Sequence, residues 1–206
     1  MTLYAIAFPN FDPVAISIGP LAIKWYGLSY LAGLILGWAY IRRLLATPRL
    51  WRDNTPPFGV TKVDDLLLYI TLGVVLGGRL GYVILYEPGA YLESPLDVLA
   101  VWKGGMSFHG AFVGCALAIW LFARRQGVSM FSTTDLCTAA VPIGLFFGRL
   151  ANFINGELFG RVTDVPWAMV FPHAAALYPN VEPATRHPSQ LYEALLEGLA
   201  LFLVLR

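Results

Sequence analysis

The chain has 206 residues, of which 57% are hydrophobic and 13% are charged, and its formal net charge is +1. Soluble domains carry about 25% charged residues, so this chain has too little polar surface to cover a water-soluble globule of its size. The composition therefore predicts a membrane protein, and the scattered basic residues give no indication of nucleic-acid binding.

Five apolar segments are predicted to be membrane-spanning helices, so the expected fold is an all-α, polytopic membrane protein forming one domain over residues 1–206. The spans cover residues 25–41, 66–85, 104–123, 136–154 and 191–205. The first ten residues have neither a basic region nor a long apolar region, so they are not read as a cleavable signal peptide. The first span is expected to act as its own insertion signal.

Basic residues predict the orientation of these spans, because loops rich in Lys and Arg remain on the cytoplasmic side. The loop after the first span contains Arg42, Arg43, Arg49, Arg52 and Lys62. Arg124 and Arg125 follow the third span, and Arg206 follows the fifth. The loop over residues 87–103 instead carries three acidic residues against one lysine. This acidic loop, the N-terminus and residues 153–187 are therefore expected on the outer face.

The first two spans carry polar side chains near their predicted outer ends. Tyr26 lies within Trp25–Gly27, with Tyr30 one turn later. This pattern is typical of an interfacial aromatic belt, and a phenol that lines a cavity is the alternative. Arg79 lies within Gly77–Tyr82 in the second span. Its side chain is expected either to reach the lipid headgroups or to face a polar pocket.

The third span begins with the glycine-rich sequence Trp102–Gly114, which contains His109. An imidazole just below the outer surface can take a proton near neutral pH, so His109 is a candidate acid–base residue. The alternative is that His109 is only hydrogen-bonded, as a single His in an apolar run usually is. Gly110 and Gly114 have the spacing of small residues that allow close helix packing.

The segment Gly148–Arg161, at the outer end of the fourth span, is the most informative part of the chain. In a helix, Arg149 and Asn152 share a face, and Asn155 extends that face if the helix continues. An arginine after a long uncharged run needs a partner. A guanidinium beside two carboxamides suits a phosphate group, because arginine binds phosphate oxygens bidentately. The alternative is an interfacial anchor in which Glu157 forms an ion pair with Arg161, four residues later.

A further polar segment, His187–Glu193, leads into the fifth span, which is apolar except for Glu193 and Glu197. It is also explained as a helix start with Gln190 near the third helical position. Zinc-ligand spacings, a P-loop and a dinucleotide fingerprint are all absent from the sequence, so no metal or cofactor is expected. The two cysteines, Cys115 and Cys137, lie in apolar runs and are expected to be unpaired thiols.

Together these motifs resemble those of the bacterial prolipoprotein diacylglyceryl transferases. The resemblance rests on Gly148–Arg161, His109–Gly114, Trp25–Gly27 and His187–Glu193, with Gly77–Tyr82 and Trp102–Phe108 in the same order, and it extends from Phe11 to Arg206. One departure is Ala111, where the family commonly has glycine. Another is that family members continue with further spanning helices, one of which carries another active-site arginine. The chain is therefore expected to be C-terminally truncated.

The resemblance implies a transferase of the bacterial cytoplasmic (inner) membrane with its active site at the outer, periplasmic face. Such enzymes move the diacylglyceryl group of phosphatidylglycerol to the lipobox cysteine thiol of a prolipoprotein. The products are a thioether and glycerol phosphate, and the reaction is the first step of lipoprotein maturation. Phosphatidylglycerol, prolipoprotein signal peptides and membrane lipids are the implied partners, without cofactor, metal or nucleic acid.

The expected catalytic residues are His109, Arg149 and Tyr26. Arg149 is expected to hold the phosphate, His109 to deprotonate the substrate cysteine or orient the headgroup, and Tyr26 to line the pocket. The expected phosphatidylglycerol-binding residues are Arg149, Asn152, Arg79, Asn155, Glu157, Gly160 and Arg161, with Glu157 and Arg161 ordering a loop over the headgroup. The alternatives are an anion transporter, for which repeat symmetry is not evident, and a non-catalytic lipid-binding module.

Overall fold

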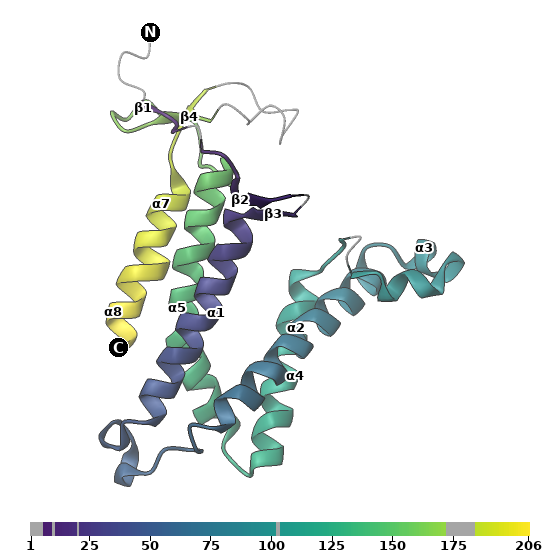
Figure 1. Ribbon diagram of the computed structural model, residues 1–206, viewed down its shortest axis with the longest axis vertical. Coiled ribbons are helices and arrows are strands. Elements are labelled where there is room, and N and C mark those ends of the chain that lie inside the picture. Colours follow the sequence, from purple (N-terminus) through teal and green to yellow (C-terminus); the bar gives the residue numbers. More distant parts are fainter. Residues whose placement is uncertain (1–5, 10, 20, 102–103, 172–183) are drawn as a thin grey trace. The chain divides into compact units, whose positions relative to one another are not determined.

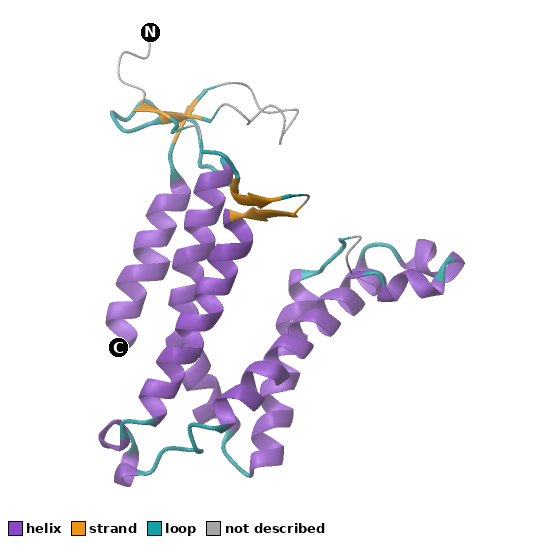
Figure 2. Cartoon of the chain, in the orientation of Figure 1, coloured by secondary structure: helices purple, strands orange, loops and turns teal. Residues whose placement is uncertain are grey.

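The computed structural model describes residues 6–9, 11–19, 21–101, 104–171 and 184–206 (Figure 1). The first five residues of the chain, and Trp102 and Lys103 of the glycine-rich sequence, lie outside the described residues. The chain divides into two compact units, one of residues 1–39 and 138–206 and the other of residues 40–137. Helices predominate in both, and the described strands are short and belong to the first unit (Figure 2).

Three helical stretches build the first unit. They are α1 (Trp25–Leu45) up to residue 39, α5 (Met130–Asn155) from residue 138, and a final stretch composed of α7 (Ser189–Glu193), the π-helical η5 (Ala194–Ala200) and α8 (Leu201–Leu205). Small residues let them pack closely. A Cβ added to Gly33 of α1 would lie 3.1 Å from the Cα of Gly144 in α5. A Cβ added to Gly198 of η5 would lie 2.6 Å from the Cβ of Phe146 in α5.

Two small β structures accompany these helices. β2 (Val14–Ile18) and β3 (Leu21–Lys24) form an antiparallel hairpin directly before α1. β1 (Ile6–Ala7), β4 (Met169–Val170) and β5 (Thr185–Arg186) form a sheet in the order β1-β4-β5, with β1 parallel to β4 and β4 antiparallel to β5. The buried rings of Phe8, Phe153 and Phe171 pack together beside them. This cluster joins the N-terminal segment to the end of α5.

The second unit is built on the pair α2 (Lys62–Leu85) and α4 (Phe108–Gln126). It also contains α3 (Pro88–Glu93) and the short 3-10 helices η1 (Pro48–Leu50), η2 (Arg52–Asn54) and η3 (Pro95–Leu99). Glycines form the α2–α4 contact. A Cβ added to Gly77 would lie 2.8 Å from the Cα of Gly114, and one added to Gly81 would lie 2.6 Å from the Cα of Gly110. The close packing predicted from the glycine spacing is confirmed.

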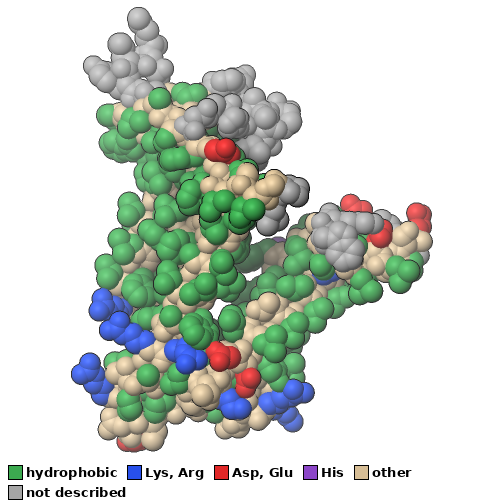
Figure 3. Space-filling model, in the orientation of Figure 1, with side chains coloured by type: hydrophobic (Ala, Val, Ile, Leu, Met, Phe, Trp, Pro, Cys, Tyr) green, Lys and Arg blue, Asp and Glu red, His purple; other side chains and the backbone are tan. Residues whose placement is uncertain are grey.

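Each predicted span overlaps a helix, so the helical character of these segments is confirmed. Two of the helices, α2 and α5, are long and apolar enough to cross a membrane by length and composition. Only 11% of the most apolar stretch of α2 and 28% of that of α5 is buried. The core helix of a soluble protein is mostly buried, so this apolar surface requires another apolar environment. Figure 3 shows hydrophobic side chains over much of the visible surface.

Candidate functional site

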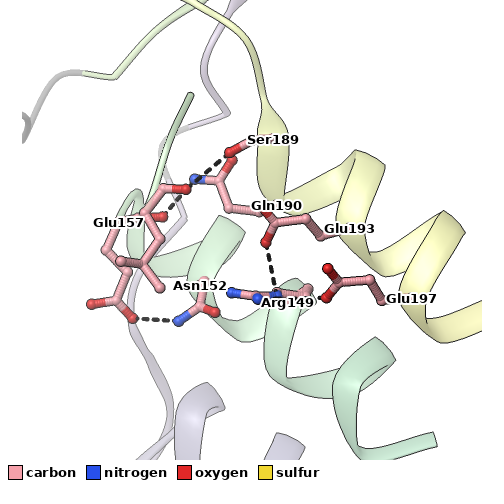
Figure 4. A network of polar contacts seen from close by, with 8 residues as sticks. Arg149, Asn152, Glu157, Ser189, Gln190, Glu193 and Glu197 are labelled. Carbon is pink, nitrogen blue, oxygen red and sulfur yellow. Dashed lines mark hydrogen bonds and ion pairs between the residues drawn. The ribbon is translucent and has the colours of Figure 1, made fainter. Parts of the chain in front are cut away.

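Polar side chains from α5, the loop that follows it and the final helical stretch meet in the first unit (Figure 4). The described members are Arg149, Asn152 and Asn155 from α5, Glu157 from the loop, and Gln190, Glu193 and Glu197 from the final stretch. Asn152 and Gln190 are buried and the others are partly exposed or exposed. We refer to these seven residues as the polar cluster.

Arg149 forms ion pairs with two glutamates. Its Nε lies 2.8 Å from Oε2 of Glu193, and its Nη2 lies 3.5 Å from Oε2 of Glu197. Among the described residues, Nε is buried without a hydrogen bond of good geometry, so the contact with Glu193 is an ion pair by distance whose N–H is not directed at the oxygen. The partner that an arginine in an apolar helix requires is therefore supplied by the protein itself.

Glu193 and Glu197 were not among the expected site residues. In the sequence they are only two charges in an apolar span, yet two carboxylates four positions apart share one helix face. Such a pair within an apolar helix needs a cation nearby. That requirement is the signal that could have assigned both glutamates to Arg149.

The two carboxamides of α5 converge on Glu157. Asn152 Nδ2 donates to Oε1 of Glu157 at 2.9 Å, and Asn155 Nδ2 donates to the same oxygen at 3.3 Å. The backbone N–H of Glu157 also donates to the carbonyl of Asn152 at 3.0 Å. The shared face predicted for Asn152 and Asn155 is thus confirmed. The Glu157 carboxylate is engaged by these amides, and the side chain of Arg161 is exposed.

The loop after α5 turns sharply. Gly156 has φ +66°, and Leu158 has φ +55°, a left-handed conformation that is costly for a bulky residue. The final helical stretch stabilises this backbone, because Gln190 Nε2 donates to the carbonyl of Glu157 at 2.6 Å and Ser189 Oγ donates to that of Leu158 at 3.0 Å. Strained loops held from outside recur at functional sites, which favours such a role here.

Gly160 and Arg161 continue this loop along the segment before α7. The N–H of Gly160 donates to the carbonyl of His187 at 2.9 Å, and the N–H of His187 donates to the carbonyl of Arg161 at 3.1 Å. A Cβ added to Gly160 would lie 2.9 Å from the Cβ of His187, so the close approach requires glycine. α7 begins at Ser189, which confirms the predicted helix start. Gln190 is its second residue rather than its third.

Tyr26 approaches the polar cluster from the first turn of α1. Its hydroxyl lies 3.3 Å from that of Tyr30, and the two rings are 5.0 Å apart. The phenol of Tyr26 also interacts with the side chain of Asn152 and with the charge of Glu157. Tyr26 is partly buried, whereas Tyr30 is exposed.

Arg79, in the second unit, is bound by backbone carbonyls. It is buried, and it lines a pocket with Tyr82, Glu87 and Tyr91, which favours the polar-pocket interpretation. Its guanidinium donates to the carbonyls of Asp97 at 2.5 Å, Val98 at 2.9 Å, Gly104 at 2.5 Å and Gly105 at 3.1 Å. These contacts join the end of α2 to the segment before α4. They favour a loop-ordering role over a direct contact with a lipid phosphate.

His109 lies in the first turn of α4, also in the second unit, and its side chain is exposed. Ser107 caps this helix, because its Oγ accepts the N–H of Gly110 at 3.2 Å. The ring of Phe108 lies edge-on to the imidazole at 5.8 Å between centroids. His109 therefore lies at the accessible start of α4.

Cys115 and Cys137 are unpaired and partly buried. Within the described residues, no group of three or more His, Cys, Asp or Glu side chains is arranged to hold a metal ion.

Comparison with known proteins identifies a family. The family model described as "prolipoprotein diacylglyceryl transferase" matches residues 13–206. The chain is 56% identical over 203 residues to the phosphatidylglycerol–prolipoprotein diacylglyceryl transferase of Rhizobium leguminosarum bv. trifolii, covering 98% of this chain and 70% of that protein. The protein of the same name from Methylocella silvestris is 56% identical over 203 residues, covering 98% and 71%. That from Rhodopseudomonas palustris is 52% identical over 207 residues, covering 100% and 70%.

Proposed function

The chain belongs to the prolipoprotein diacylglyceryl transferase family, and we propose that it transfers the diacylglyceryl group of phosphatidylglycerol to the lipobox cysteine thiol of a prolipoprotein. The reaction forms a thioether, releases glycerol phosphate and is the first step of lipoprotein maturation. The names of the relatives give phosphatidylglycerol and prolipoproteins as their substrates, and the identity of 52–56% supports the same substrates here.

The membrane location follows from the family and from the exposed apolar helices. We place the protein in the bacterial inner membrane as a single integral domain with five spans, with the N-terminus outside. Tyr26 and Arg43 lie at opposite ends of α1, separated by roughly 25 Å at 1.5 Å per residue. If basic ends are cytoplasmic, this separation supports a polar cluster near the periplasmic face.

The reaction requires a nucleophile and a site that stabilises the negative charge developing on the leaving phosphate. The sulfur of the lipobox cysteine attacks the glyceryl carbon, the C–S bond forms and the C–O bond to the phosphate breaks. The thiol proton passes to a base, and the electron pair of the broken bond goes to the leaving phosphate. A thiol with a pKa of about 8.5 needs a base or a positive environment to react as thiolate. Donors near the phosphate oxygens stabilise the leaving group.

Residues of the polar cluster have the character that this reaction needs. Arg149 supplies a cation, and neither of its ion pairs uses Nη1. Asn152 and Asn155 supply amide groups on the same face, and Tyr26 supplies a phenol beside Asn152. We propose that Arg149 binds the phosphate, assisted by the two carboxamides, and that Tyr26 lines the headgroup pocket.

The other predicted site residues have roles around Arg149 in this proposal. We propose that His109 deprotonates the substrate cysteine or orients the headgroup. Glu157, Gly160 and Arg161 order the loop after α5, since their backbone groups bond to the start of the final helical stretch. Arg79 is assigned to ordering the segment before α4 instead of to direct headgroup binding, because its donors are directed at backbone carbonyls.

The observation that carries the proposal is a charged arginine held beside two carboxamides at the end of an apolar helix. The test is to incubate the purified chain with phosphatidylglycerol vesicles and a synthetic lipobox peptide. We expect a diacylglyceryl thioether on the cysteine by mass spectrometry and equimolar glycerol phosphate. A peptide with serine in place of the cysteine is the control. Anion flux across the vesicles without any lipidated peptide would instead support a transporter.

A further inference from the structure

We infer that Glu193 and Glu197 have different roles at Arg149. Glu193 is the permanent partner that positions the guanidinium, and Glu197 is an exchangeable partner that the lipid phosphate displaces. This inference rests on the proposed binding of phosphatidylglycerol by Arg149. It adds two positioning residues and a stated order of contacts to that site.

The two ion pairs are unequal. The contact of Arg149 with Glu193 is 2.8 Å, whereas that with Glu197 is 3.5 Å. The side chain of Glu193 is 32% exposed and that of Glu197 is 47% exposed. Electrostatic attraction falls with distance and with access of water, so the Glu197 pair is the weaker of the two. It is therefore the pair that a competing anion breaks first.

The residues next to Glu193 are also more buried than those that precede Glu197. Glu193 lies between Gln190, which is fully buried and bonded to the loop, and Ala194, which is 2% exposed. Glu197 instead follows Leu195 and Leu196, which are 54% and 67% exposed. The side chain of Glu193 thus has more buried neighbours in the helix, whereas that of Glu197 is flanked on one side by exposed leucines.

The helix itself is irregular at this point. Ala194–Ala200 is π-helical, and π-helical segments are rare and frequently found at functional sites. Glu193 precedes this segment and Glu197 lies within it. Gly198 brings the segment against α5, where an added Cβ would lie 2.6 Å from the Cβ of Phe146. Because Phe146 is one turn before Arg149, this approach sets how closely the two carboxylates reach the guanidinium.

The net charge around Arg149 explains why the lipid phosphate displaces one of the two glutamates. One guanidinium with two carboxylates has a net charge of −1 before lipid binds, and a phosphodiester would make it −2. Glu193 contacts Nε, whereas Glu197 contacts Nη2. A phosphate bound bidentately at the Nη1–Nη2 edge needs Nη2 and so competes with Glu197, but it leaves the Glu193 contact in place. Release of Glu197 therefore relieves the repulsion without freeing the arginine.

The test compares Glu193→Gln and Glu197→Gln with Asp164→Asn, an exposed carboxylate of the same unit, as the matched control. Initial rates are measured with the lipobox peptide at varied phosphatidylglycerol in mixed micelles. Glu197→Gln should lower KM for phosphatidylglycerol by roughly 2- to 5-fold, because a competing anion is removed. Glu193→Gln should lower kcat by about 10-fold or more, because a misplaced guanidinium no longer meets the leaving group.

Product inhibition and a charge-conserving variant test the same inference independently. Glycerol phosphate should inhibit Glu197→Gln more strongly than the unmodified chain and Glu193→Gln more weakly. If Glu193→Gln does not insert stably, Glu193→Asp, which keeps the charge, should insert and recover part of kcat. Equal losses of kcat in both Gln variants, or a raised KM in Glu197→Gln, would overturn the inference while leaving the transferase activity in place. Absence of thioether product from the unmodified chain would overturn the proposed function and this inference together.

Discussion

The carboxamide of Gln190 donates to the backbone carbonyl of Glu157 at 2.6 Å, across 33 residues of chain. Gln190 is fully buried, so this bond lies out of contact with water. It fixes the loop whose next residue, Leu158, has a left-handed backbone. The start of the final helical stretch therefore determines the conformation of the loop beside Arg149.

Replacing Gln190 with Leu should destabilise this loop. The substitution keeps a similar volume but removes the donor to the Glu157 carbonyl, which costs about 1–3 kcal/mol. It also removes Oε1 of Gln190, a buried acceptor without a hydrogen-bond partner among the described residues, which offsets part of that cost. We expect a lower thermal midpoint in detergent and faster amide exchange at residues 156–161. Gln126→Leu, at the last residue of α4, is the matched control and should leave exchange in that loop unchanged. Unchanged exchange in Gln190→Leu would contradict the structural role of this bond.

Arg149→Ala should abolish lipidation, since the phosphate loses its cation. It should also destabilise the protein, because Glu193 and Glu197 are left in an apolar helix without a counter-charge. The measurement is product formation by mass spectrometry together with the thermal midpoint.

A triple variant separates these two effects. Arg149→Ala combined with Glu193→Gln and Glu197→Gln should recover most of the lost stability but no activity, because the uncompensated charges are gone and the cation is still absent. Near-normal lipidation by either form would exclude Arg149 from phosphate binding.

Arg79→Lys should loosen the segment before α4 even though it keeps the positive charge. A lysine cannot bond four carbonyls in the geometry of a guanidinium, so several of the bonds to Asp97, Val98, Gly104 and Gly105 are lost. We expect faster amide exchange over residues 97–101 and a loss of stability of about 2–3 kcal/mol. A raised KM for phosphatidylglycerol with unchanged exchange would instead indicate direct headgroup binding by Arg79.

Gly77→Ala should destabilise the α2–α4 pair. The added Cβ would lie 2.8 Å from the Cα of Gly114, and backbone atoms cannot move away at low cost. Overpacking of this kind costs about 1–3 kcal/mol. Gly89→Ala is the control, because a Cβ there meets no atom within 4 Å. Equal thermal midpoints for the two variants would show that the contact between these helices is looser than described.

Replacing both cysteines, Cys115→Ala with Cys137→Ala, should leave lipidation intact. The attacking sulfur belongs to the prolipoprotein, so neither thiol of the chain takes part. Both thiols are partly buried, and a stability loss of about 1 kcal/mol is expected from the lost packing. Loss of turnover in a correctly folded double variant would instead indicate a covalent enzyme intermediate.

The helical segments could be predicted from sequence because hydrophobicity and charge are local properties. The common face of Asn152 and Asn155 is equally local, and it was predicted from helix periodicity. The β2–β3 hairpin was not predicted, because its apolar residues resemble those of the adjacent first span. The β1-β4-β5 sheet joins Ile6 to Met169, a pairing that no local pattern indicates.

The site residues likewise include some that the local sequence reveals and some that only the packing of distant helices reveals. Arg149 stands out in the sequence because a charge in an apolar span is rare. Its ion pairs with Glu193 and Glu197 depend on how two distant helices pack, so they were missed. The partners of Arg79 are backbone carbonyls, which any residue type supplies, and no sequence motif could have identified them.

The ion pairs of Arg149 also constrain how the protein is made. During synthesis, Arg149 leaves the ribosome a few seconds before Glu193, at translation rates of roughly 5–20 residues per second. If α5 spans the bilayer as proposed, it carries an uncompensated charge there until the final helix arrives. α5 and the final helix should therefore leave the insertion machinery as a pair, and ribosome-stalled chains that end before Glu193 should retain α5 beside it.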